Sequence, residues 1–265
     1  MHELNAQLES AREACATEKA VIFPLKFINE DHFGLVKAGL HFQAEFASLL
    51  YSMISSREHF YAVLKTEFAP RLRAVAFKGT GQNFRRVAGD MIHAINIQGN
   101  KWGDSCTVNL GLHLTFLPDT LQVMPDLKTI KEIDCEFRFR MFVDEGRDQW
   151  WLYGTTPMEA EQSARSLIAT YFDFGEPHFS RYNQPTALVA ELEQIVFGHR
   201  PAEHWLQRLS LVRAALAGAR IHLHYGNLAE SKRFARAGLN HIRNPVGIAL
   251  REELNALAQD TDKLD

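Results

Sequence analysis

Six polar side chains stand at alternating positions in three strand-like stretches of the chain. Alternation of apolar and polar residues places every second side chain on the same face of a β-strand. Amide, imidazole and guanidinium groups gathered on one sheet face can hydrogen-bond a phosphate or a partner's carboxylate. The candidate binding residues with this spacing are Asn96, Gln98, Asn109, His113, Arg138 and Arg140.

A polar strand face also has two simpler explanations. Antiparallel sheets commonly expose one face to water, and residues 1–52 could instead cover this face. Asn and Gln are nevertheless unfavourable in strands. A specific hydrogen-bonding role for this face therefore stays a prediction beside both alternatives.

Trp102 is a separate candidate, because it stands in a polar, glycine-containing loop beside Lys101 and Asp104. Aromatic residues of this kind are typical anchors of protein interfaces. The ring could equally fold back over the core, and we keep both interpretations. Trp150 and Trp151 are adjacent, so a strand there would place one ring on each face.

The histidines and cysteines form no recognisable catalytic or metal-binding pattern. His222 and His224 are two residues apart on an expected helix, so their side chains diverge and do not share a metal ion. Cys15, Cys106 and Cys135 lack CxxC spacing, which is typical of reduced thiols in a cytoplasmic protein. Nucleotide-binding, hydrolase and metalloprotease motifs do not occur in the sequence. We expect no catalytic residue, no metal and no cofactor.

Periodicity predicts the sheet that carries the candidate residues. Alternation indicates an antiparallel sheet of four to five strands, of which the first three form a meander that is half-buried. Gly89-Asp90 is a turn signal between the first two strands, and we expect another turn at residues 77–81. Gly111, inside the third strand, indicates a bulge or the close approach of another backbone. The expected strands cover residues 82–87, 91–98, 106–116, 135–143 and 150–153.

Two amphipathic helices are expected to pack on this sheet. The first covers residues 57–75, and Pro70 is expected to kink or end it. The second is capped by Thr155 or Thr156 and is expected to end before Gly175-Glu176-Pro177.

The carboxy-terminal part shows helical periodicity only. Gly226-Asn227 separates two helices whose small residues permit close packing, and this pair, residues 209–243, resembles a single tetratricopeptide-like hairpin. Helices are also expected at residues 2–19 and 31–51. The predicted domains are an amino-terminal extension (1–52), an α+β sheet domain (53–184) and a helical region (185–265).

Composition excludes several classes of protein. The 265 residues are 46 % hydrophobic, enough for a full core. The formal net charge is −3, from 29 basic and 32 acidic side chains, without the basic excess that nucleic-acid binding needs. No apolar run reaches transmembrane length, and the polar amino terminus does not resemble a secretory signal. We expect a cytoplasmic protein that binds neither nucleic acid nor membranes.

Three short pieces of sequence resemble a known family. They are Phe84-Arg85-Arg86, the INIQ motif of residues 95–98 and the TVNLG motif of residues 107–111. In this order, after a helix, they resemble the bacterial domain-of-unknown-function family 4304 over about residues 54–182. The resemblance implies an α+β fold with a meander of strands, and it implies no active site.

These observations favour a non-catalytic binding protein. The leading hypothesis is a bacterial immunity protein that neutralises a cognate toxin by occluding it, based on the resemblance, the acidic balance and the missing catalytic motifs. One alternative is an enzyme or small-ligand-binding protein that uses the polar sheet face; a deep pocket there would favour it. Another is a helical-repeat adaptor built on residues 186–258. The sequence does not predict the oligomeric state.

Overall fold

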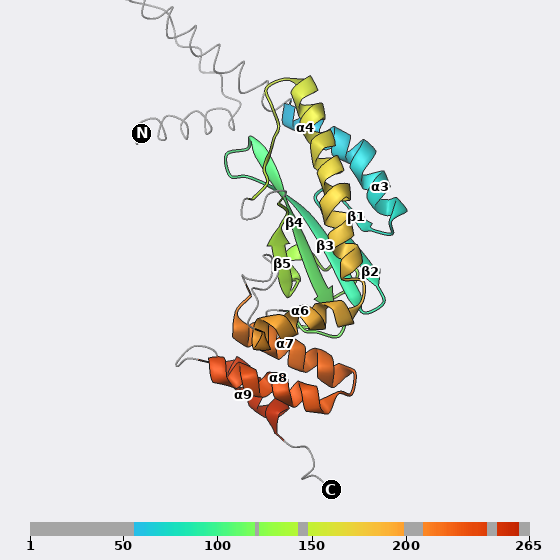
Figure 1. The fold of residues 1–265 in the computed structure, drawn as a ribbon. Helices are drawn as coiled ribbons and strands as arrows, with labels where there is room; N and C mark the ends of the chain where they lie inside the picture. The colour runs from blue at the N-terminus through green and yellow to red at the C-terminus, as the bar shows by residue number, and fades with distance from the viewer. Residues whose placement is uncertain (1–55, 120–121, 143–147, 199–208, 243–247, 260–265) are drawn as a thin grey trace, which may run out of the picture. The chain divides into compact units, whose positions relative to one another are not determined.

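The protein has an α+β fold, as the sequence predicted (Figure 1). The computed structural model describes residues 56–119, 122–142, 148–198, 209–242 and 248–259, and all of them belong to one compact unit, Leu49–Asp265. The helices expected at residues 2–19 and 31–51, and thus the extension 1–52, lie outside the described residues. Among the described helices, none combines the length and the apolar character that a membrane crossing requires.

Six antiparallel strands form the sheet, in the order β1-β2-β3-β4-β5, with β6 paired to the start of β4. The prediction that residues 77–81 form only a turn was wrong, because β1 lies there as a short, mostly exposed edge strand. The strands are β1 (Lys78–Thr80), β2 (Asn83–Ala88), β3 (Met91–Gly99), β4 (Ser105–Leu114), β5 (Phe137–Arg140) and β6 (Trp151–Leu152).

The inner face of the sheet carries the main core. Phe84, Ile95, Leu110 and Phe139 are directly opposite one another in β2 to β5 and are all buried. The Phe68 ring packs edge-on against the Phe84 ring, with centroids 6.2 Å apart. Alternation of apolar residues therefore identified the inner face of the meander correctly.

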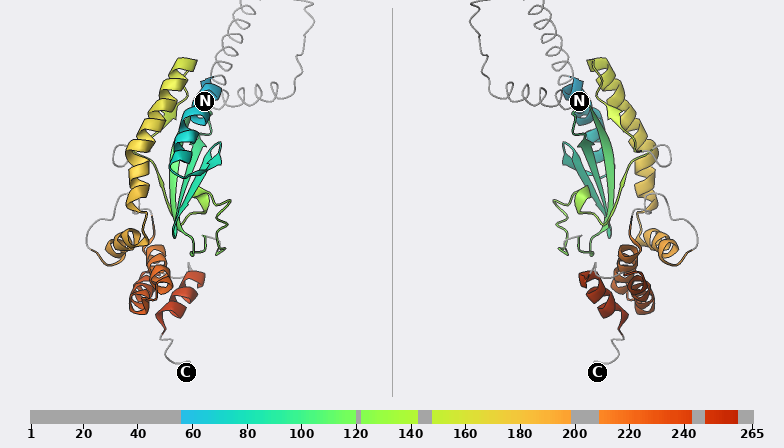
Figure 2. Two further views of the ribbon diagram at one scale, coloured as in Figure 1. Left: turned by 90° about the vertical axis from the view of Figure 1, so that its right-hand side faces the viewer. Right: turned by 90° about the vertical axis from the view of Figure 1, so that its left-hand side faces the viewer.

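The outer face is partly covered too, so β4 is buried at every position rather than on one face. The connection from β4 to β5 places Ile130 and Cys135 in a small apolar cluster with Ile92 and Ala94. Figure 2 shows this connection (green) and α4 (Pro157–Thr170, yellow) on opposite sides of the sheet. The half-buried strand expected from the sequence is thus a central strand with both faces covered.

Gly111 is the position where the connection lies closest to β4. It pairs in regular register with Ala94 and Arg138, so the chain has no bulge there. A Cβ atom at Gly111 would lie 2.8 Å from the Cys135 Sγ atom and 3.2 Å from the Glu132 Cα atom. Of the two explanations for this glycine, close backbone approach is the correct one.

Both helices on the inner face contain a π-helical turn that ends two residues before a proline. Residues 56–63 continue through η2 (Leu64–Phe68) into α3 (Ala69–Ala74), and α4 continues through η4 (Tyr171–Gly175) into α5 (Glu176–Arg181). These helices lie side by side (Figure 1), with the Phe68 ring 5.2 Å from the Tyr171 ring.

The π-turns explain why neither helix stops at its proline. The N–H of the residue before each proline donates a hydrogen bond to the carbonyl five residues earlier, which closes the π-turn. The proline then lies in the first turn of the next α-helical segment, where a backbone N–H is not needed. The prediction that the second helix ends before Gly175-Glu176-Pro177 was therefore wrong. The prediction of its start was right, because the Thr156 side chain accepts a hydrogen bond from the Glu159 N–H (3.2 Å).

Four further helices lie side by side in chain order (Figure 1). The tight packing expected of the hairpin formed by the second and third of them is present. The Ser231 hydroxyl donates to the Ala219 carbonyl (2.8 Å), and a Cβ atom at Gly218 would lie only 2.3 Å from the Phe234 ring. The helices are α6 (Pro185–Phe197), α7 (Leu211–His224), α8 (Leu228–His241) and α9 (Ile248–Ala258).

Candidate functional site

A ladder of polar side chains crosses the outer face of the sheet. Asn83, Asn96, Asn109 and Arg140 are directly opposite one another in β2, β3, β4 and β5. The Arg140 Nε–H donates to Asn109 Oδ1 (3.3 Å). Asn109 Nδ2 donates to Asn96 Oδ1 (3.3 Å). Asn96 Nδ2 in turn donates to Asn83 Oδ1 (2.9 Å). Hydrogen bonds that all point the same way polarise one another, so the ladder is a rigid polar strip.

Two further side chains join the ladder, and one aromatic ring lies beside it. Asn109 Nδ2 also donates to Gln98 Oε1 (2.8 Å). Arg140 Nη1 donates to Asp148 Oδ2 (2.5 Å), and the guanidinium lies 5.2 Å from the centre of the Trp150 ring. Since Asp148 neutralises Arg140, the ladder presents hydrogen-bonding groups without an excess of positive charge.

His113 and Arg138 share the outer face but lie outside the ladder. His113 is buried; its Nδ1 accepts from the Glu136 N–H (3.0 Å), and its Nε2 donates to the Leu117 carbonyl (3.1 Å). Burial lowers the pKa of His113, which keeps the imidazole neutral at pH 7. Arg138 pairs with Glu132 of the connection (2.7 Å). Both residues hold the connection against the sheet.

Trp102 lies at the end of the sheet where β3 turns into β4, and its side chain is 67 % exposed. The ring does not fold back over the core; it stacks with the Lys101 ammonium at 4.5 Å. Leu152 pairs with Ser105 at the start of β4 and is 63 % exposed. Trp150 is also exposed, whereas Trp151 is buried on the inner face, as the alternation predicted. We call the exposed side chains of Trp102, Trp150 and Leu152 the Trp102 surface.

The thiols of Cys106 and Cys135 and the His224 ring contribute to packing. Cys106 and Cys135 are buried and form no disulfide, and burial raises the pKa of the Cys106 thiol to about 12. His224 stacks on Phe116 with ring centres 3.6 Å apart. In the described ranges, no group of three or more His, Cys, Asp or Glu side chains gathers as metal ligands would.

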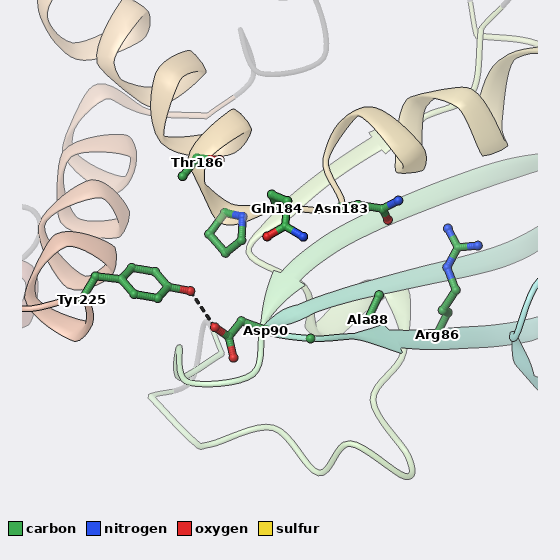
Figure 3. Close-up of a pocket in the computed structure, with 9 residues that line it drawn as sticks. Arg86, Ala88, Asp90, Asn183, Gln184, Thr186 and Tyr225 are labelled. Carbon is green, nitrogen blue, oxygen red and sulfur yellow. Dashed lines mark hydrogen bonds between the residues drawn. The ribbon is translucent and has the colours of Figure 1, made fainter.

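A pocket of about 700 Å³ lies away from the ladder, where the β2–β3 turn meets the connection between α5 and α6 (Figure 3). Asp90 and Tyr225 form one end of it; the Tyr225 hydroxyl donates to Asp90 Oδ2 (2.6 Å). Arg86 forms the other end, and Asn183 and Gln184 line the pocket between them.

Arg86 belongs to a buried polar network beneath this pocket. Its side chain is 10 % exposed, and Nη1 donates to Glu176 Oε1 (2.6 Å) and to the Val75 carbonyl (3.0 Å). Its Nε–H donates to His93 Nδ1 (3.1 Å). Glu176 also accepts from the Tyr171 hydroxyl (2.8 Å). The charge of Arg86 is therefore already compensated inside the protein.

The structure brings together four of the predicted site residues: Asn96, Gln98, Asn109 and Arg140. It places Trp102 at the end of the same sheet, His113 under the connection and Arg138 beside it, paired with Glu132. Sequence reasoning did not find the pocket, because its walls come from segments up to 139 residues apart, Arg86 to Tyr225. One available signal was Arg86 itself. It stands two residues after the inward-facing Phe84, so its charged side chain is expected on the inner face of the sheet, where a charge is unusual.

Comparison with known proteins supports the family resemblance. No curated protein and no solved structure matches the chain. Residues 68–181 match the family model described as Domain of unknown function (DUF4304). The match runs from the end of η2 through the whole sheet to the last residue of α5. This part of the chain therefore has the resemblance inferred from its sequence motifs.

Proposed function

We propose that the protein is a non-catalytic binding protein that holds a partner protein against the outer face of its sheet. The observation that carries this proposal is the Trp102 surface, in which Trp102 and Leu152 are 67 % and 63 % exposed and Trp150 lies beside Arg140 of the polar ladder. Aromatic residues are enriched in protein interfaces, and neighbouring exposed apolar side chains are typical of surfaces that a partner covers.

The ladder suits the polar part of such an interface. Asn96, Asn109 and Arg140 are fixed by one another and by Asp148. Side chains that are already ordered lose little conformational entropy when a partner binds. A rigid polar strip beside exposed aromatic anchors therefore favours recognition of a folded protein surface.

The finer proposal is that this partner is a toxin and that the protein is a bacterial, cytoplasmic immunity protein that occludes it. This step is supported by the family resemblance and by the formal net charge of −3, and it is an argument from analogy. Immunity by occlusion needs only a surface that covers the toxin's active site and requires no catalytic group in the inhibitor.

Affinity capture tests both levels of the proposal. The tagged protein is used to capture binding partners from the cells in which it occurs, and mass spectrometry identifies what is retained. We expect one stoichiometric protein that is toxic when expressed alone and harmless when the two proteins are co-expressed. If the folded protein retains nothing specific, the proposal is wrong; a retained partner that is not toxic removes only the immunity step.

Substitutions locate the interface in the same experiment. Trp102→Ala and Leu152→Ser should weaken capture, with a loss on the order of 30-fold in affinity for an aromatic anchor. Phe174→Ala is the matched control, because Phe174 is an exposed aromatic residue of η4, which belongs to the helices on the opposite, inner face of the sheet. Equal capture by Trp102→Ala, Leu152→Ser and the control would exclude the Trp102 surface as the interface.

A second candidate function is the binding of a small ligand, and the pocket between Arg86 and Tyr225 favours it. Its volume of about 700 Å³ lies within the usual range of ligand pockets, roughly 300–1,000 Å³. The sequence analysis expected a small ligand to bind at the polar face of the sheet, but this pocket is formed by other residues. The chemistry of the pocket is therefore argued separately below.

A further inference from the structure

Of the two charged residues among the described lining of the pocket, Arg86 has an opposite charge beside it and Asp90 has none. Among the described residues no cationic side chain forms an ion pair with Asp90, whose hydrogen-bond partner is the neutral Tyr225 hydroxyl (2.6 Å). Arg86, by contrast, is held at 2.6 Å by Glu176. Counted with Glu176 behind it, the pocket carries one net negative charge, located at Asp90.

The walls beside Asp90 suit an organic cation with an apolar stem. Pro185 lines the pocket and offers an apolar wall. The Tyr225 ring lies beside Asp90 (Figure 3) and offers an aromatic face. Aromatic faces attract ammonium and guanidinium groups. The amide oxygens of Asn183 and Gln184 supply further acceptors, and in the described part of the chain their side chains have no hydrogen-bond partner of their own.

We propose that this pocket binds an alkylguanidinium or alkylammonium group, with the cation on Asp90 and the alkyl stem between Pro185 and Tyr225. The inference is independent of the partner protein proposed above, because the pocket shares no residue with the Trp102 surface. The cation can come from a free amine or from an arginine or lysine side chain of a polypeptide. Both sources present the same chemistry to Asp90.

Two ligands of the same shape test the charge. Butylguanidine and butylurea differ in that only the first is cationic at pH 7. Titration of the ¹⁵N-labelled full-length protein with each should give saturable NMR shifts at Gly89, Asp90 and Tyr225 with butylguanidine, and butylurea should bind about 10-fold more weakly or not at all. Equal binding of the two compounds would overturn the proposal without any mutation.

Variants test the position of the cation. Asp90→Asn should weaken butylguanidine binding about 10-fold or more, whereas Asp173→Asn, the same change at an exposed aspartate, should not. Tyr225→Phe should retain binding. It keeps the aromatic ring, and it removes the hydroxyl that occupies Asp90 Oδ2, so both carboxylate oxygens can accept from the cation. Binding that survives in a folded Asp90→Asn protein would place the cation elsewhere and overturn the proposal.

A third comparison distinguishes the sources of the cation. N-acetyl-arginine amide carries the same guanidinium on a peptide backbone. Binding as tight as that of butylguanidine assigns the pocket to a side chain of a polypeptide; much weaker binding assigns it to a free amine. Both results support the proposed chemistry, and failure of both compounds to bind overturns it. Loss of toxin capture would leave this result unchanged.

Discussion

Two imidazoles packed against the core, those of His93 and His178, give the protein a defined response to acid. Burial, followed by the nearby Arg86, lowers the pKa of His93 to about 3. Burial, followed by Arg181 and His93, lowers the pKa of His178 to about 3. Both rings are therefore neutral in the folded protein, while an exposed histidine in the unfolded chain takes up a proton near pH 6.5.

The folded protein should lose stability as the pH falls below about 6.5, because only the unfolded state then binds these protons. The expected loss is about 2 kcal/mol per histidine between pH 7 and pH 5. His93→Gln should remove the contribution of His93, since glutamine can accept from Arg86 without titrating. Urea unfolding at pH 7 and pH 5 measures the difference.

His59→Gln is the matched control for this measurement, because His59 is exposed. It should keep the wild-type loss of stability between the two pH values. If the His93→Gln protein loses as much stability as the wild type, the titration of His93 does not contribute to acid unfolding.

At the scale of elements, sequence patterns identified what repeats along the chain and missed what depends on distant segments. Alternation located five of the six strands and the inner face of the meander. It missed β1 because Lys78–Thr80 is three residues long, centred on Gly79 and without a buried side chain. Proline rules predicted the end of a helix at Pro177, but a π-turn, which has no sequence pattern of its own, carries the chain past it.

The candidate site shows the same division. The period of two placed Asn96, Gln98, Asn109 and Arg140 on one face. It could not tell which of them are neighbours, because register depends on where each turn begins. It also could not show that His113 is buried, since the β4–β5 connection that covers it has no periodicity. The Asp90 pocket was beyond local patterns altogether.

Close packing of α7 on α8 gives a prediction at this scale. Alanine normally favours a helix over glycine by about 1 kcal/mol. At Gly218, however, a Cβ atom would lie 2.3 and 2.4 Å from two atoms of the Phe234 ring. We expect Gly218→Ala to lower the free energy of unfolding by about 1–3 kcal/mol, because overpacking outweighs the gain in propensity.

A double-mutant cycle checks the cause of that loss. Phe234→Leu makes room for the new methyl group, so Gly218→Ala should cost clearly less in the Phe234→Leu background than in the wild type. Chemical denaturation of the four proteins gives the coupling energy. If the Gly218→Ala protein is more stable than the wild type, α7 and α8 accommodate the methyl group without strain, and the overpacking argument is wrong.

At the scale of the whole described unit, α7 and the residue after it connect the carboxy-terminal helices to the sheet. Arg213 forms a bidentate ion pair with Glu136, whose side chain is 6 % exposed. His224 stacks on Phe116, and Tyr225 bonds to Asp90. These contacts predict that the sheet and the helices α6–α9 unfold together, although the family match ends at residue 181.

Removing the Arg213 side chain tests this coupling, because it leaves the buried Glu136 carboxylate without its cation. We expect Arg213→Ala to cost about 2–3 kcal/mol. Hydrogen exchange read by mass spectrometry should show α8 losing protection before β3 and β4, whereas in the wild type the three lose it together. Arg165→Ala is the control, since its exposed pair with Glu67 should contribute only about 0–1 kcal/mol. If α8 loses protection before β3 and β4 already in the wild type, the helices α6–α9 form an independent unit. Residues 68–181 would then be stabilised only by the sheet and the helices within that range.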